Sequence, residues 1–221
     1  MLLRITKMLA LILLVIPSVN AQESYQSMNI NAQLISAAKR NQIDLLTRAL
    51  NAGARPNSRN RAGDTPLNLA ARNGNVEMVK ILLGAGSNVN QTNLEKITPL
   101  MSAAFQGHEL IAKLLLGQGA DIHLQDQSQK TAMVLAAGNG QAQVLKTFLE
   151  HGVAVDARYH NDLTALMWAA GHGDPESVKV LLEAKADRNL KDNRGKTALV
   201  IAREAKNADV VALLENAGAR D

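Results

Sequence analysis

Apolar and polar positions along most of the chain recur in blocks of constant length. In one block, residues 65–71 begin with threonine and proline and end in two alanines, and residues 76–83 carry apolar side chains at helical spacing. The turn sequence Asn73-Gly74 separates the two segments, and a polar loop leads into the next block. This order predicts a helix, a tight turn, a second helix and a loop in every block.

The blocks keep one register over nearly the whole chain. Residues 32–38 carry the first copy of the pattern, and threonine begins the next five copies at a step of 33 residues, at Thr65, Thr98, Thr131, Thr164 and Thr197. A fixed period of this length is typical of a solenoid built from stacked supersecondary units. We therefore expect six helix pairs, in units that span residues 30–59, 60–92, 93–125, 126–158, 159–191 and 192–221.

A second landmark follows the same step. Glycine comes after the second apolar stretch of five units, and lysine takes its place once, at Gly53, Gly86, Gly119, Gly152, Lys185 and Gly218. A helix C-terminus that needs a left-handed residue favours glycine, which has no Cβ to clash. Lys185 is the one exception to this rule.

These features resemble the ankyrin-repeat family. The resemblance rests on Asp192-Asn-Arg-Gly-Lys-Thr-Ala-Leu, on Gly107-His108 and on Leu114-Leu-Leu-Gly-Gln-Gly-Ala-Asp-Ile122, and it covers residues 30–221. It implies an all-α solenoid of six stacked helix-turn-helix units with connecting β-hairpin-like loops, and a non-catalytic role in binding another protein. In one respect the chain departs from the family, whose histidine after the Thr-Pro-Leu triplet bonds to the threonine hydroxyl. That position holds Asn68, Met101, Val134, Met167 and Val200 here, so we expect this polar bracing to be missing.

Polar residues replace apolar ones at both ends of the array. Arg48 stands where other units place residues such as Ile81, and Arg203 and Glu215 stand where internal units carry alanine and leucine. A solenoid needs polar ends because its terminal units lack a neighbour. We expect the array to be complete in this chain and the protein to be monomeric on its own.

Four large apolar residues form the core of the predicted binding surface. In the family that the chain resembles, partners dock on a concave surface made by the loop tips and the exposed ends of the first helices. The corresponding positions here hold Leu94, Ile97, Phe105 and Leu163. Exposed apolar clusters mark interaction sites, so these residues are the first candidates for contact with a partner. The alternative is that they tuck against neighbouring loops.

Charged and aromatic residues extend this surface. Arg40 and Arg72 would form a basic rim suited to the carboxylates of a partner, and His160 and His172 occupy the same kind of position in the fifth unit. Trp168 is the only tryptophan, but its position holds leucine or isoleucine in other units, and we interpret it as packing between units rather than as a binding hot spot.

The N-terminus resembles a secretory signal peptide. Two cations, Arg4 and Lys7, precede nine apolar residues at 8–16, and small side chains stand at Val19 and Ala21. We expect a signal peptide at 1–21, a short extension at 22–29 and a periplasmic or secreted protein. A membrane anchor is the alternative, but a span needs about 20 apolar residues.

Composition excludes several kinds of chemistry. The chain has no cysteine, no glycine-rich phosphate loop and no serine in a nucleophile elbow, so we expect no enzyme activity and no cofactor. Between Lys39 and Arg72 the chain has seven cations and only two acidic residues. This excess of positive charge could steer an acidic partner or form a solvated face. Nucleic-acid binding is not expected, because aromatic residues do not interleave the cations and export would remove access.

Three functions stay open. The first is an envelope protein that supports or restrains a specific partner; exported bacterial proteins that look like this chain include ones associated with stress enzymes such as catalase and ones that inhibit a cell-wall or lipid enzyme. An effector delivered into a host cell is the second. A small hydrolase or metal site in the fifth unit is the third, since His160 and His172 share that unit with Asp162 and Asp174, although no metal-binding spacing supports it.

Overall fold

The computed structural model describes residues 29–220, and within that range it contains helices, turns and loops but no strand. The first helix covers residues 29–39 of this range. The elements that follow are α2 (Ile43–Asn51), α3 (Pro66–Asn73), α4 (Val76–Gly84), α5 (Pro99–Gln106), α6 (Glu109–Gly117), α7 (Ala132–Ala137), α8 (Ala142–Glu150), the 3-10 turn η1 (His160–Asp162), α9 (Ala165–His172), α10 (Pro175–Glu183), α11 (Ala198–Glu204) and α12 (Ala208–Asn216). The predicted all-α class is confirmed.

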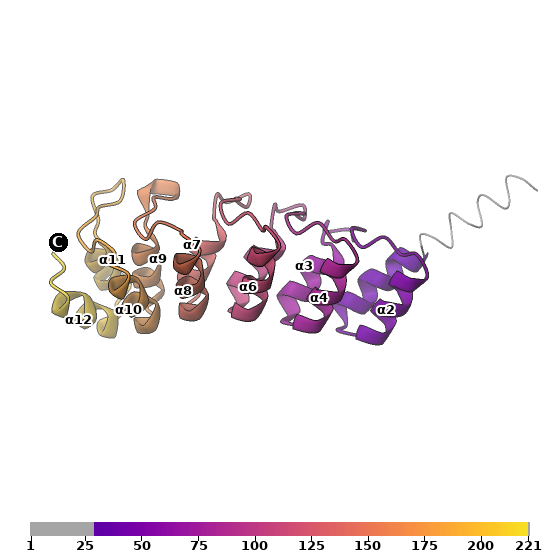
Figure 1. The fold of residues 1–221 in the computed structure, drawn as a ribbon. Helices are drawn as coiled ribbons and strands as arrows, with labels where there is room; N and C mark the ends of the chain where they lie inside the picture. Colours follow the sequence, from indigo (N-terminus) through magenta and orange to yellow (C-terminus); the bar gives the residue numbers. More distant parts are fainter. Residues whose placement is uncertain (1–28, 221) are drawn as a thin grey trace, which may run out of the picture.

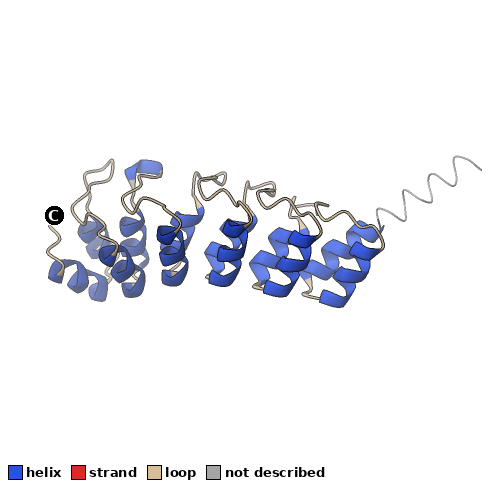
Figure 2. Cartoon of the chain, viewed as in Figure 1, coloured by secondary structure: helices blue, strands red, loops and turns tan. Residues whose placement is uncertain are grey.

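The helix pairs stand side by side in a single row, from the first pair to α11 and α12 (Figure 1). In one layer, α3, α5, α7, α9 and α11 contact each other in succession. The even-numbered helices from α2 to α12 form the second layer in the same way. The loops run along one edge of the row (Figure 2). The predicted solenoid of six stacked units is therefore confirmed.

Threonine starts the first helix of five units by capping its free N–H groups. Each of the five threonines has an extended backbone, and its hydroxyl accepts a hydrogen bond from the third residue of the helix. A cap of this kind stabilises a helix by about 1 kcal/mol. The threonine that the sequence repeats every 33 residues thus fixes where each first helix begins.

The expectation that the threonines lack polar bracing is wrong for the second unit. Asn68 is fully buried, and its Oδ1 accepts hydrogen bonds from the Thr65 hydroxyl at 2.7 Å and the Thr65 N–H at 3.1 Å. Its Nδ2 donates to the Ile97 carbonyl of the next unit at 3.2 Å. An amide can replace the family's histidine here because it carries both an acceptor and a donor.

Left-handed residues end the second helices. Gly53, Gly86, Gly119, Gly152 and Gly218 have φ values of 90, 84, 80, 87 and 81°. Lys185 has a φ of 68° and shares this conformation, although its Cβ makes it costly. The register predicted for these positions is confirmed, and Lys185 carries strain that glycine would not.

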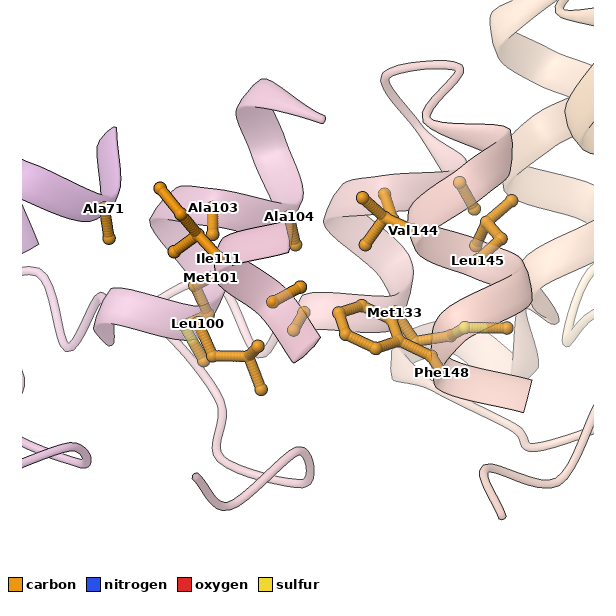
Figure 3. Packing of buried hydrophobic residues seen from close by; sticks show 14 of the residues in the cluster. Ala71, Leu100, Met101, Ala103, Ala104, Ile111, Met133, Val144, Leu145 and Phe148 are labelled. Carbon is orange, nitrogen blue, oxygen red and sulfur yellow. The ribbon is translucent and has the colours of Figure 1, made fainter. Parts of the chain in front are cut away.

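Small and branched side chains fill the space between the units. Ala103 and Ala104 of α5 and Ile111 of α6 are fully buried, and so is Phe148 of α8 (Figure 3). Alanine lets neighbouring first helices approach closely, while the larger residues fill the gaps between layers. Arg48, at the first end of the array, is exposed, as a polar cap requires.

The loops close like hairpin turns without forming strands in the described range. In each, the N–H of the first loop residue donates to the carbonyl four residues later, at Asn60, Asn93, Asp126, Tyr159 and Asp192. In all but the Tyr159 loop, the side chain of that residue also accepts two backbone N–H groups. Tyr159 has no oxygen placed for this, and its loop instead forms η1, with Asn161 and Asp162 both left-handed.

A ladder of side chains joins neighbouring units at the other end of the loops. Asn57 donates to the Gly86 carbonyl at 3.3 Å and accepts from the Asn88 N–H at 2.8 Å. Asn90 makes the corresponding pair of bonds one unit later. His123 is next in register, and within the described chain its side chain makes neither bond. The ladder is therefore interrupted between the third and fourth units.

The predicted signal peptide at 1–21 lies outside the described residues, as does nearly all of the extension at 22–29. Among the helices of residues 29–220, none combines the length and the apolar character that a membrane crossing requires.

Candidate protein-binding surface

Three hollows open where the first helices meet the loops. The N-terminal hollow lies between the first helix and residues 55–61 and has a volume of about 930 Å³. The central hollow, between α5, α7 and their loops, measures about 480 Å³. The Trp168 hollow, between α9 and α11, measures about 340 Å³. Because the hollows use the same repeat positions, they lie on one face, and we call this face the groove.

The central hollow brings together three of the predicted residues. Phe105, at the end of α5, is 46% exposed. Ile97 is half-buried and packs against the core, so its side chain partly tucks in, as the alternative interpretation held. Arg72 and Lys130 stand at the rim. An apolar floor inside a charged rim suits a large apolar side chain of a partner.

Arg72 is less available to a partner than the sequence suggested. Its guanidinium lies 3.1 Å from the Asp64 carboxylate, which is buried at the base of the loop. Asp64 also accepts a hydrogen bond from Asn93 of the next unit at 2.9 Å. Arg72 therefore serves first to neutralise a buried carboxylate, and it contributes an oriented rather than a free cation to the rim.

Leu94 lies at a loop tip outside the central hollow. Its side chain is 62% exposed, and its N–H donates to the Ala62 carbonyl of the preceding loop at 3.0 Å. Gly63 makes this approach possible, because a Cβ on it would come within 2.7 Å of the Leu94 nitrogen. The tips are thus bonded to one another, and Leu94 projects from a supported loop.

The fifth unit supplies the Trp168 hollow, which also contains Leu163 and His172. Trp168 is half-buried, with the ammonium of Lys130 5.2 Å from the centre of its ring. The repeat position that holds Arg72 and Phe105 in the second and third units holds glycine in the fourth and fifth, at Gly138 and Gly171, and both glycines line this hollow. Their missing side chains leave the indole an accessible face. Trp168 also packs against the buried core, in agreement with the interpretation from the sequence, and the neighbouring glycines leave part of it open to the hollow.

His160 and His172 do not form a joint site. His160 is exposed at the loop tip and contacts the Gln129 side chain at 2.8 Å through Nδ1. Asp174 caps α10 by accepting the Ser177 N–H at 2.8 Å. Among residues 29–220, no three histidine, aspartate or glutamate side chains gather in a way that could hold a metal ion. The hydrolase or metal-site alternative therefore gains no support from the described residues.

Arg40 is in the N-terminal hollow, apart from the other predicted residues. The same hollow contains Lys39, Arg55, Arg59 and Arg61. Arg40 was predicted as a contact, and all five cations belong to the stretch from Lys39 to Arg72 that was expected to steer an acidic partner or form a solvated face. The structure gathers them around one hollow.

Stacked helix pairs with hollows at the same repeat positions define a repeat solenoid. The family model described as ankyrin repeats (3 copies) matches residues 34–126, 100–192 and 133–220, and the chain belongs to this family. No curated protein matches the chain. Ankyrin repeats imply a protein–protein binding module, and no enzyme family is indicated.

Proposed function

We propose that the groove binds one specific protein in the envelope of a bacterium and supports or restrains that partner without catalysing a reaction. The single observation that carries the proposal is Phe105, a large apolar side chain held 46% exposed above a hollow with an apolar floor and a charged rim. Exposing such a side chain to water is unfavourable, so its burial by a partner would contribute about 1 to 2 kcal/mol to binding.

Export to the envelope is part of the proposal. It is supported by the order of residues at the N-terminus, with Arg4 and Lys7 before the apolar run at 8–16 and small residues at Val19 and Ala21. The absence of cysteine from the chain is compatible with either redox environment.

Site-specific photocrosslinking in cells tests the groove. A photoreactive amino acid at Gln106, in the central hollow, should give one discrete adduct, identified by mass spectrometry. The same probe at Lys113, exposed on α6 in the other layer, is the positional control and should give none. Adducts of equal yield at both positions, or none from the groove, would contradict the proposal.

Two substitutions make the test specific. Phe105→Glu should abolish the Gln106 adduct because it places a charge in the apolar contact. Leu110→Glu is the matched control, since Leu110 is 63% exposed on α6.

Cell fractionation distinguishes the envelope role from the host-cell alternative. A chain processed after Ala21 and retained in the periplasm supports an envelope role, whereas release beyond the envelope supports the host-cell alternative.

A further inference from the structure

The largest hollow of the groove concentrates positive charge. Lys39 and Arg40, at the end of the first helix, face Arg55, Arg59 and Arg61 on the following loop across the N-terminal hollow. All five are exposed, and the hollow has no aspartate or glutamate in its lining. Four of the five are guanidinium groups, which bind carboxylates in a bidentate manner.

Within residues 29–220, none of the five cations takes part in an ion pair. The nearby carboxylate of Asp64 is already occupied by Arg72 and Asn93. Arg59 contacts the Gln91 amide, which is neutral. The cluster therefore produces a positive potential that no acidic side chain of the described chain cancels.

We infer that the N-terminal hollow binds an acidic, extended segment of the protein partner, in which aspartate or glutamate carboxylates pair with these guanidinium groups. This inference rests on the proposed function and adds the chemistry of the partner. The positive charge of the hollow favours an acidic segment of the partner. The hollow lies at the N-terminal end of the groove, so this segment would precede the apolar contact along the array. Acidic residues lie over the first two units, and the apolar contact follows at Phe105.

The dimensions favour a polypeptide over a small anion. A volume of about 930 Å³ is near the upper limit of pockets that enclose whole ligands, roughly 300–1,000 Å³, and far exceeds what one phosphate fills. The lining also includes Ala32, Ile35 and the hydroxyls of Ser36 and Ser58, which suit the apolar and backbone groups of a peptide.

The same features disfavour a membrane surface. Protein segments that bind bilayers insert aromatic or large aliphatic side chains beside their cations. The large apolar side chains that are exposed in the described chain are Leu45, Leu94, Phe105 and Leu110, and none of them lines this hollow. A concave cluster without an inserting residue fits a chain that lies in it, not a flat lipid surface.

Binding of a fluorescent peptide rich in aspartate and glutamate to the purified protein tests the inference by anisotropy. We expect saturable binding that weakens as salt rises, and much weaker binding of the peptide in which asparagine and glutamine replace the acids. The combined variant Arg40→Gln, Arg55→Gln and Arg61→Gln should lose at least about tenfold in affinity, because three charge-assisted contacts are removed.

The matched control removes three cations elsewhere. Lys80→Gln, Lys113→Gln and Lys179→Gln change the net charge by the same amount on the second helices and should alter affinity less than about twofold. Equal losses in both variants, failure of the peptide to bind, or binding only of anionic vesicles or inorganic phosphate would overturn the inference. Phe105→Glu should still bind the acidic peptide, so failure of the central contact is distinguishable from failure of this one. Circular dichroism melts confirm that each variant is folded.

Discussion

At the C-terminal end of the array, the guanidinium of Arg203 lies 2.7 Å from the carboxylate of Glu215. The pair joins α11 to α12 across the last unit. In the preceding unit the same positions hold Ala170 and Leu182, which pack against a neighbour. The ion pair thus replaces the apolar side chains of an internal unit by partly exposed charged ones, so this face of the last unit is hydrated.

Removing this pair should make the protein self-associate. Arg203→Ala with Glu215→Leu gives the last unit the side chains of an internal one, so we expect dimers in sedimentation velocity at concentrations where the native chain sediments as a monomer. Lys179→Ala with Glu176→Leu is the matched control, because it removes an exposed ion pair of α10 and should leave the protein monomeric. Identical sedimentation of both variants would refute the capping role.

Lys185→Gly should stabilise the protein. Lys185 is exposed and left-handed, with a φ of 68°, so glycine removes strain without removing a buried contact. We expect the free energy of unfolding in urea to rise by about 1 kcal/mol. The reciprocal change, Gly152→Lys, should lower it by a similar amount, since Gly152 has a φ of 87° and open space around it. An unchanged midpoint for both would show that these positions carry no strain.

Restoring the interrupted ladder should also stabilise the array. His123→Asn places an amide where Asn57 and Asn90 bond to the next unit, and it can form the same two hydrogen bonds across the third and fourth units. We expect a gain of about 1 kcal/mol in the free energy of unfolding, because the loop backbone already has the required course. Asn90→His should cost a comparable amount. A loss of stability in His123→Asn would show that the histidine has a contact of its own.

The repeat could be predicted from the sequence because the residues that start and end its helices act locally. Threonine caps and terminal glycines act within a few residues of themselves, so their 33-residue step gave the helix pairs and the left-handed positions directly. Lys185 could be placed by register alone, even though lysine does not favour its conformation.

Features that depend on how the loop and the next unit fold back were beyond that reasoning. Asn68 was predicted to leave Thr65 unbraced, yet an amide oriented by Ile97 of the next unit braces it. Arg72 was predicted as a free rim cation, but the loop of its own unit brings Asp64 back onto it. The first outcome depends on a contact between units and the second on the course of a loop within one unit, and the linear pattern contains neither.

Acid should weaken the loop of the sixth unit through Asp192. Burial by itself would raise the pKa of this carboxyl, but hydrogen bonds from the Lys196 N–H and from the side chain and N–H of Arg194 outweigh it and hold the pKa below its ordinary value. A lowered folded-state pKa stabilises the fold above the unfolded value of about 3.9, and the contribution is lost as pH falls through the folded pKa. Asp192→Asn should therefore be clearly less stable than the native chain at neutral pH, with a gap that narrows near pH 3.

Urea unfolding at both pH values measures that gap. Asp126→Asn is the control. Asp126 accepts hydrogen bonds from the corresponding two backbone N–H groups, which an asparagine oxygen can also accept, and within the described chain no arginine pairs with it. The loss of stability in Asp126→Asn at neutral pH should therefore be smaller than in Asp192→Asn. A gap for Asp192→Asn that is the same at neutral and acid pH would contradict the assignment.

Filling the Trp168 hollow should change the surface without harming the fold. Gly171 is helical, and a Cβ on it would lie 3.3 Å from the Ile201 Cγ2, so Ile201 must shift slightly to admit a side chain. Gly171→Leu should change the free energy of unfolding by less than about 1 kcal/mol, because the helix preference of leucine offsets this close contact. Since Trp168 is the only tryptophan, its emission reports the change directly, and we expect a shift to shorter wavelength as leucine covers the indole. Gly84→Leu, in α4 with open space around it, should stabilise the helix without moving the emission.

If the groove is the binding face, Gly171→Leu should also reduce the photocrosslinked adduct at Gln106, and Gly84→Leu should not. A partner that binds both variants equally would place its contacts outside the fifth unit.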